Sequence, residues 1–377
     1  MKLLVTFIAT FSFIGISWAA DFSHPGLLNS KVEYELMRMK VKSGAEPWAN
    51  AFKYMPNYGA HVPKPVAILS ESVAAQYNND GRAAYGSALR YIVTSDAQHA
   101  EKAKRIIDAW SRTLQSYGTI TPLSNGVALG RFLFAAEILK HSYSGWPTVD
   151  QCRFAAMVRL LLKRLWPANV SSTNRWHKAN SAANGAHARM AAAVYLNDSS
   201  LFDQAVNEAR SLISFYIGRH GNPVPIGFTY ETCRYLGGNG PGDIGTLKGG
   251  DIKHAQYGLG WLVQSAEIAK KQELDLYSHV DPVDKASLLT ALIYHEPFVG
   301  YPRRGSAATW PCKIQLDKVP YGTWYHMPWQ VAYNHYRDAR FKKVIGAFLN
   351  PNYGLSPYKA VTTGADFEML THNYNLP

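Results

Sequence analysis

The stretch from residue 179 to residue 218 reads ANSAANGAHARMAAAVYL (179–196) and then, after a short turn, SLFDQAVNEARSLISFYIG (200–218). The first segment is rich in small residues, whereas the second carries charged and apolar residues at helical spacing. The same alternation pairs the Gly/Ala-rich segment 83–92 with the charged segment 97–117. A repeated pairing of this kind predicts a ring of helical hairpins, with the small-residue helices inside and the charged helices outside.

Helical patterns cover most of the chain, and we count about ten of them without a convincing run of alternating strand residues. We therefore predict an all-α fold, an incomplete (α/α) toroid of helical hairpins. A globin-like bundle is the simpler alternative, but it does not account for so many similar hairpins. Two stretches interrupt the helices: Pro56 to Asn79, which reads as a surface loop, and the glycine-rich segment Gly218 to Gly250.

The first 19 residues have one early lysine, an apolar core and small residues at Ser17 and Ala19. This pattern predicts a signal peptide over residues 1–19, cleaved near Ala19, and hence a secreted or periplasmic protein. A membrane anchor is disfavoured because the apolar core is short for a span of about 20 residues. No linker divides the rest, so we predict that residues 20–377 form a single domain.

The chain has a formal net charge of +12, which favours a polyanionic partner. For a secreted protein, an acidic polysaccharide is a better candidate than nucleic acid or a membrane, and we expect a monomer. Ten Trp and 23 Tyr would suit stacking on sugars, although the core could use about half of them. Three cysteines allow one disulfide and one free thiol.

The helical stretch 251–277, DIKHAQYGLGWLVQSAEIAKKQELDLY, places Asp251, His254 and Tyr257 along its first two turns. A carboxylate one turn from a histidine can hold its tautomer, and a neighbouring tyrosine can donate a proton. Gly258 and Gly260 follow, at a cost of roughly 1 kcal/mol each in a helix, which suggests a close approach by a ligand or another helix.

A second group lies at Asn180, Asn184 and His187, spaced i, i+4 and i+7 along one helix face. An amide there could hydrogen-bond to a substrate carboxylate, or Asn180 could simply cap its helix. The candidate substrate-binding residues are those near this group or in aromatic and basic stretches elsewhere: Trp176, His187, Arg303, Arg304, His335 and Tyr336. No zinc motif, phosphate loop or Gly-x-Ser-x-Gly is present, and His177 and His187 lack a glutamate at metal-binding spacing, so no metal site is predicted.

Several stretches of the chain, from about His24 to beyond Tyr336, resemble the alginate lyase superfamily of secreted α/α-toroid polysaccharide lyases. The matching pieces are HPGLL with a helix ending in GAEPW, TSDAQHAEKAKRIIDAWS, AAEILKHSYSGW, Asn180 with MAAAVYLNDSSLFDQAV, ETCR, DIKHAQYGLG, QELDLY and VAYNHY. The resemblance implies β-elimination on a polyuronate, most simply alginate or polymannuronate, with no redox cofactor.

By the same resemblance, Asn180 and Arg234 neutralise the substrate carboxylate, and His254 acts as the base or a second neutralising group. Tyr257, at a position where some branches keep a catalytic tyrosine, acts as the general acid and could also serve as the base. Two features differ from the family pattern. Ser181 follows Asn180 where some alginate lyases have a histidine, and the glycine-rich segment separates Arg234 from Asp251. The family-like contexts ETC and WPC imply a disulfide between Cys233 and Cys312, with Cys152 as the free thiol.

Three other functions are open on the sequence. The first is a lyase acting on glucuronan. The second is an inverting glycoside hydrolase, which needs two carboxyl groups about 6.5 to 9.5 Å apart, for which Glu231 and Asp251 are the nearby candidates. The third is a non-catalytic protein that binds anionic glycans.

Overall fold

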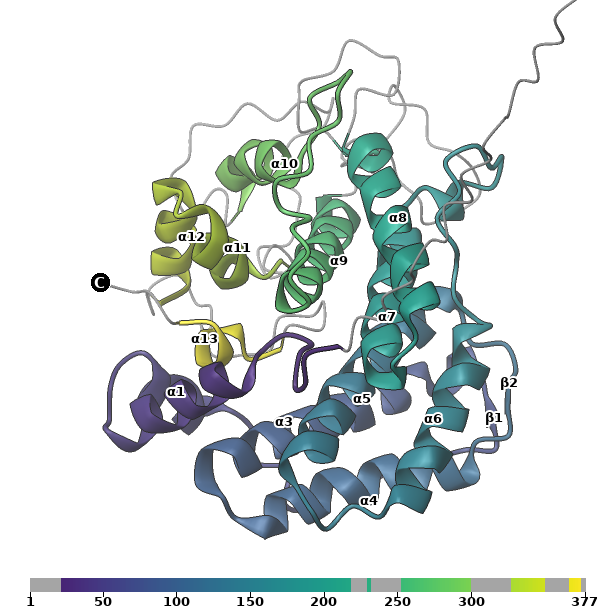
Figure 1. Cartoon of the computed structure of the whole chain (residues 1–377), viewed down its shortest axis with the longest axis vertical. Helices are drawn as coiled ribbons and strands as arrows, with labels where there is room; N and C mark the ends of the chain where they lie inside the picture. The colour runs from purple at the N-terminus through teal and green to yellow at the C-terminus, as the bar shows by residue number, and fades with distance from the viewer. Residues whose placement is uncertain (1–21, 218–228, 232–251, 300–326, 350–365, 374–377) are drawn as a thin grey trace, which may run out of the picture.

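The computed structural model describes residues 22–217, 229–231, 252–299, 327–349 and 366–373 (Figure 1). Two very short strands and three 3₁₀ turns accompany the α-helices in this part of the chain. The helices are α1 (Lys31–Lys42), α2 (Trp48–Tyr54), α3 (Ala74–Thr94), α4 (Ala97–Thr113), α5 (Pro122–Ser142), α6 (Thr148–Leu162), α7 (Asn180–Leu196), α8 (Ser199–Tyr216), α9 (Ile252–Lys271), α10 (Leu288–His295), α11 (Trp329–Tyr336), α12 (Ala339–Leu349) and α13 (Glu368–Thr371). The strands are β1 (Ile68–Leu69) and β2 (Ser116–Tyr117), and the 3₁₀ turns are η1 (Glu71–Val73), η2 (Arg175–His177) and η3 (Glu296–Phe298).

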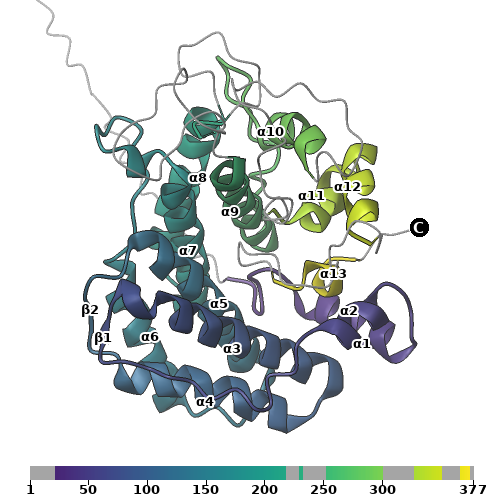
Figure 2. The ribbon, with the colours of Figure 1, turned by 180° about the vertical axis from the view of Figure 1, so that it is seen from behind.

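Successive helices form hairpins whose first members are neighbours of one another, since α3 packs on α5, α5 on α7 and α7 on α9. Helices α4, α6 and α8 pack on the outside of this row (Figures 1 and 2). The predicted α/α toroid is therefore confirmed, including the assignment of the Gly/Ala-rich segments to the inner layer.

Helix starts follow the capping chemistry of the sequence. Ser30 and Glu33 form a reciprocal capping box at α1, and Asp96 and Asp198 accept backbone N–H groups at the starts of α4 and α8. Helix α1 ends before Gly44, which adopts φ +70°, the left-handed conformation that glycine takes most easily. These local signals explain why the predicted positions of these helices agree with the structure.

The inner helices are buried over nearly their whole circumference. In α7 all residues from Asn180 to Tyr195 are buried, and small side chains let its neighbours approach closely. A Cβ added at Gly126 of α5 would lie 1.9 Å from Oδ1 of Asn184 on α7, so only glycine fits this crossing. One hydrophobic cluster continues from Leu27 near the N-terminus to Leu370 on α13.

The structure differs from the sequence predictions mainly at element ends. The predicted loop 56–79 contains β1 and η1, and its last residues belong to the first turns of α3. Strand β1 pairs in parallel with β2, with Ile68 opposite Ser116 and Leu69 opposite Tyr117. Two-residue strands are too short to produce an alternating pattern, so the sequence gives no signal for them.

The C-terminal helix α13 contacts α1, α2 and α11, which brings the end of the described chain against its beginning (Figures 1 and 2). Among the described residues, no helix combines the length and the apolar character needed to cross a membrane.

Candidate active site

The first turn of α7 is joined to two other segments by a buried glutamate. Oε1 of Glu231 accepts hydrogen bonds from the backbone nitrogen of Asn180 at 3.1 Å and from its Nδ2 at 2.7 Å. Oε2 of Glu231 accepts a hydrogen bond of 2.6 Å from the hydroxyl of Tyr216 at the end of α8. The side chain of Asn180 does not cap α7. Its amide group instead donates a hydrogen bond to Glu231.

Tyr216 extends this connection to the first turn of α9. Its hydroxyl lies 3.4 Å from the carbonyl oxygen of His254 and 3.3 Å from that of Ala255. Gly258 makes the contact possible, because a Cβ at this position would lie 2.2 Å from the Tyr216 hydroxyl oxygen. The close approach expected at the glycines of this helix is therefore explained, at Gly258, by a neighbouring tyrosine.

His254 and Tyr257 are half-buried and lie on the same side of α9. Their rings meet edge to face with centroids 5.8 Å apart, and the Tyr257 ring also lies 5.7 Å from that of Trp261. The structure thus brings together two of the predicted catalytic residues, and the Glu231–Tyr216 connection links their helix to Asn180.

An open pocket of about 290 Å³ lies beside Tyr257. Its lining comes from three inner helices: Ala74, Ala75 and Asn78 of α3, Leu123, Ser124 and Val127 of α5, and Tyr257 and Trp261 of α9. All of these residues lie in the first three turns of their helices, and Asn180 lies at the start of α7. Four helix N-termini, each with partial positive charge, therefore point to the same end of the toroid, which suits an anionic ligand.

A buried ionic network supports the α3 side of this pocket. The guanidinium group of Arg131 on α5 is paired with the carboxylate of Asp366 and donates to Oδ1 of Asn78. Asn78 therefore lines the pocket, and the hydrogen bond from Arg131 fixes the orientation of its side-chain amide. Asn78 and Trp261 were not predicted from the sequence, because they line the pocket only when α3, α5 and α9, which are far apart in the chain, are assembled.

His187, predicted to bind substrate, lies inside the protein with 1% of its surface exposed. Its ring packs edge to face on Phe134 with centroids 5.7 Å apart, and burial together with the positive charge of Arg131 lowers its pKa to about 3. Neighbouring Asn184 is also fully buried. Of Asn180, Asn184 and His187, which share this helix face, only Asn180 is hydrogen-bonded to Glu231.

The other candidate substrate-binding residues in the described part of the chain lie on two different elements, η2 and α11. Trp176 is in η2, just before α7, and its carbonyl oxygen accepts from Ser181 Oγ at 2.8 Å. His335 stacks on Tyr277 with centroids 4.0 Å apart, and the hydroxyl of Tyr336 donates to the carbonyl of Tyr277 at 2.9 Å. His335 and Tyr336 therefore contact the segment after α9 rather than its first turns.

Several predicted residues lie outside the described residues, namely Asp251, Arg234, Arg303, Arg304, Cys233 and Cys312. Cys152, on α6, is exposed and free.

The described helices thus form a toroid of hairpins with Tyr257 in an open pocket at the ends of its inner helices. The sequence matches the alginate lyase family over residues 29–304, and the chain belongs to that family, whose members are polysaccharide lyases. No curated protein matches the chain significantly in sequence.

Solved structures of alginate lyases share the fold over nearly the whole chain at low identity. Alginate lyase A1-III from Sphingomonas species A1 is 13% identical with a TM-score of 0.64, covering 95% of this chain and 97% of its own. A tyrosine-to-phenylalanine variant of A1-III complexed with a tetrasaccharide gives the same identity and TM-score, with 96% and 98% covered. An alginate lyase from Bacteroides ovatus is 13% identical with a TM-score of 0.62, covering 93% of this chain and 100% of its own.

Proposed function

We propose that the protein cleaves alginate, with polymannuronate as the simplest substrate, by β-elimination that leaves 4,5-unsaturated uronate ends. The observation that carries this proposal is the position of Tyr257, in an open pocket where the N-termini of the inner helices converge. Helix N-termini favour a carboxylate, and the buried ring of Trp261 packs beside that of Tyr257 and supports it in the pocket lining. Family membership and the net charge of +12 support an acidic polysaccharide.

In the proposed reaction, the substrate carboxylate is neutralised so that the proton on C5 becomes acidic. A base removes that proton, the C4–C5 double bond forms as the C4–O4 bond breaks, and an acid protonates O4. Asn180 and Arg234 neutralise the carboxylate, His254 acts as the base or as a further neutralising group, and Tyr257 donates the proton to O4 and can also act as the base. The elimination requires no redox cofactor.

The hydrogen bonds at Asn180 suit the proposed role. Glu231 takes one Nδ2 hydrogen of Asn180, and the second hydrogen is available to a carboxylate oxygen. Because the carboxylate of Glu231 also accepts from Tyr216 and is fully buried, it is poorly suited to act as the acid of an inverting hydrolase. This observation favours elimination over hydrolysis.

The test is ultraviolet absorbance of the product's double bond when purified protein acts on polymannuronate, polyguluronate and glucuronan. Growth of the band on the first two supports an alginate lyase, and growth on glucuronan alone would move the substrate to glucuronan. Reducing ends without the band would indicate a hydrolase, and binding without either product would indicate a glycan-binding protein. Each of these last two outcomes overturns the proposal.

Substituting Tyr257→Phe tests the assignment of the acid. The hydroxyl is lost while the ring remains in place against Trp261, so turnover falls by about 10²-fold or more with an unchanged fold. Tyr54→Phe on α2, where the tyrosine is 54% exposed, is the matched control and keeps full turnover. Full turnover of the Tyr257→Phe variant would show that another residue carries the proton.

We further propose that the protein is secreted or periplasmic after cleavage near Ala19, acts as a monomer and carries a disulfide between Cys233 and Cys312. Mass spectrometry of the mature protein before and after reduction tests the N-terminus and the disulfide together. A mature chain that begins at Met1, or three reactive thiols without reduction, would contradict this part of the proposal.

A further inference from the structure

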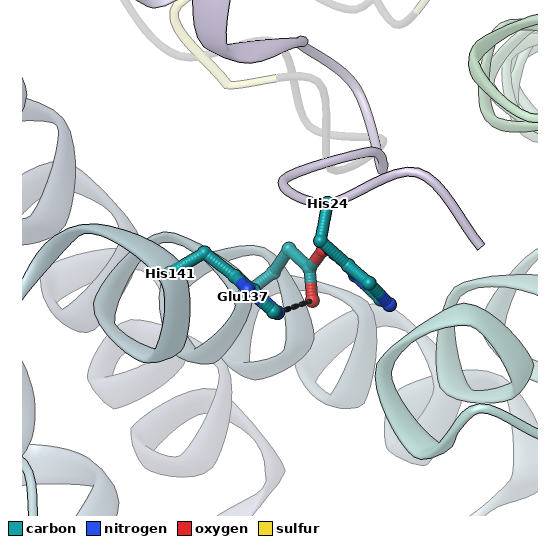
Figure 3. Close-up of side chains that lie close together, drawn as sticks. All are labelled: His24, Glu137 and His141. Carbon is teal, nitrogen blue, oxygen red and sulfur yellow. Dashed lines mark hydrogen bonds and ion pairs between the residues drawn. The ribbon is translucent and has the colours of Figure 1, made fainter. Parts of the chain in front are cut away.

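Three potential metal ligands converge at the opposite end of α5 from the pocket (Figure 3). Glu137 and His141 lie one turn apart on α5, and His24 reaches them from the segment before α1. Nδ1 of His24 lies 2.7 Å from Oε1 of Glu137, and Nε2 of His141 lies 3.7 Å from Oε2. One ligand atom from each residue falls within 4.8 Å of the others.

The carboxylate of Glu137 is buried, and only one of its two oxygens is hydrogen-bonded. Oε1 is close to His24 and accepts from the backbone nitrogen of Gly26 at 3.2 Å. Oε2 is buried and has no hydrogen-bond partner among the described residues. A buried carboxylate oxygen without a hydrogen bond is costly, and the 3.7 Å contact with Nε2 of His141 is too long to be one, so a cation at this position would compensate it.

The orientation of His24 also suits coordination. Nε2 of His24 lies 2.8 Å from Oδ1 of Asn197, the residue that follows α7. Because the amide oxygen of Asn197 and the carboxylate of Glu137 can only accept, both ring nitrogens of His24 donate when no metal is bound; a metal ion would replace the hydrogen on Nδ1, while Nε2 keeps its hydrogen bond to Asn197. Metal-bound histidines commonly have such an acceptor on the second ring nitrogen, which fixes the tautomer and the ring orientation.

His141 completes the cluster from the surface. Its ring stacks on that of His24, with centroids 4.3 Å apart and planes 7° from parallel. Parallel rings must tilt apart to direct both lone pairs at one ion, and His141, whose side chain is 23% exposed, borders solvent where such a rotation is possible. The nearby cationic side chain, Lys140, bonds to the carbonyl of Tyr195 at 3.1 Å and lies over that ring.

We propose that His24, Glu137 and His141 bind one divalent transition-metal ion, with Zn²⁺ as the best fit. Two imidazoles and one carboxylate are a usual set of zinc ligands, and the solvent side at His141 leaves a fourth position for water. Two nitrogen ligands disfavour Ca²⁺ and Mg²⁺, which prefer oxygen. This site departs from the sequence prediction of no metal, because His24 lies more than a hundred positions before Glu137 and His141 in the chain and the three residues match no motif.

The ion would act as a structural clamp rather than in the elimination. Glu137 lies ten residues beyond Val127 of the pocket on the same helix, which is about 15 Å along the axis. The cluster joins the N-terminal segment to α5 directly and to the end of α7 through Asn197. Bound Zn²⁺ therefore stabilises the packing of the N-terminal segment around His24 against α5 and the end of α7.

The test uses the full-length mature protein without a histidine tag, stripped with a chelator and then titrated with Zn²⁺. We expect about one Zn²⁺ per chain by equilibrium dialysis and a rise in the unfolding midpoint of about 3 °C or more. Co²⁺ in place of Zn²⁺ gives visible absorption bands of a tetrahedral site with nitrogen and oxygen ligands. Turnover is the same with and without Zn²⁺, so the test stands independently of the proposed activity.

Three variants locate the ion. His141→Ala, at the surface, and His24→Ala lose the bound Zn²⁺, the Co²⁺ bands and the thermal shift. His99→Ala, on α4 outside the cluster, keeps all three. If His24→Ala fails to fold, His141→Ala alone decides. No stoichiometric binding by the parent protein, or equal binding by the His141→Ala variant, would overturn the proposal.

Discussion

Glu231 holds the side-chain amide of Asn180, with Oε1 2.7 Å from Nδ2 and both residues buried. Only the NH₂ end of an amide can donate to a carboxylate, so this contact fixes which way Asn180 faces. The same carboxylate accepts from Tyr216, whose hydroxyl lies against α9. Glu231 is therefore a positioning residue that sets Asn180 and the first turns of α9 relative to each other.

Replacing Glu231 should lower kcat more than it changes KM. In Glu231→Gln the side chain has one accepting oxygen and one NH₂ group, so it cannot accept from both Asn180 and Tyr216. The alignment of Asn180 is then lost, and we expect kcat to fall by about 10²-fold. The measurement is initial rates on polymannuronate together with the thermal midpoint. Glu35→Gln, at an exposed position of α1, is the control. A Glu231→Gln variant with parental kcat would show that Glu231 does not position Asn180.

Gly258 should tolerate no side chain, although alanine is the better helix former. The added Cβ would lie 2.2 Å from the hydroxyl oxygen of Tyr216, which must then leave Glu231. Overpacking of this kind costs about 1–3 kcal/mol, against roughly 1 kcal/mol gained in helix propensity, so Gly258→Ala should unfold earlier and turn over more slowly.

Gly346→Ala on α12 is the matched control for Gly258→Ala. It is an exposed helical glycine with no atom within 4 Å of the added Cβ, so it should gain up to about 1 kcal/mol. Urea denaturation of both variants compares them directly. Equal stabilisation of the two would show that the Tyr216 contact does not restrict Gly258.

The sequence was sufficient to predict the toroid because each hairpin carries its own signal. The Gly/Ala-rich segment beginning at Asn180 and the charged segment after Asp198 differ in the width of their apolar faces, and the caps at Asp96 and Asp198 mark helix starts locally. The start of α3 was missed because Ala74 to Asp80 includes asparagines that resemble a loop.

The candidate site was only partly predictable, since it depends on contacts between distant segments. His254 and Tyr257 share a helix, so their proximity follows from spacing. The connection from Asn180 through Glu231 to Tyr216, and the burial of His187, follow only from how α7, α8 and α9 pack. No local pattern distinguishes a polar residue that faces a pocket from one that faces a neighbouring helix.

His187 should make the fold sensitive to acid. Burial and Arg131 lower its pKa to about 3, whereas in the unfolded chain it titrates near 6.5. Between these values the unfolded state binds the additional proton, so stability rises with pH and is lost as pH falls below about 6.5, by about 1.4 kcal/mol per pH unit.

The variant His187→Leu removes this titration, so the slope of its unfolding free energy between pH 4 and pH 6 should be smaller than that of the parent by about that amount. Chemical denaturation at several pH values measures both slopes. Parallel slopes would mean that His187 is protonated in the folded protein.

Glu368 should make stability change with pH in the opposite direction, between pH 4.5 and about 8. It is buried on α13, and Oε2 accepts from the backbone nitrogens of Gln330 at 2.9 Å and Val331 at 3.3 Å. Burial raises its pKa to about 8, although these backbone donors act to lower it. Between the ordinary value of 4.5 and about 8, the folded state keeps a proton that the unfolded state has lost, so stability falls as pH rises, by about 1.4 kcal/mol per unit.

Glu368→Gln keeps a carbonyl oxygen for the two backbone donors but does not titrate. Its unfolding free energy should therefore approach or exceed that of the parent as pH rises from 5 to 8, whereas Glu35→Gln at the surface should follow the parent throughout. Denaturation curves at pH 5, 6.5 and 8 decide the matter. A constant difference between the Glu368→Gln variant and the parent would show that Glu368 ionises in the folded protein as it does in the unfolded chain.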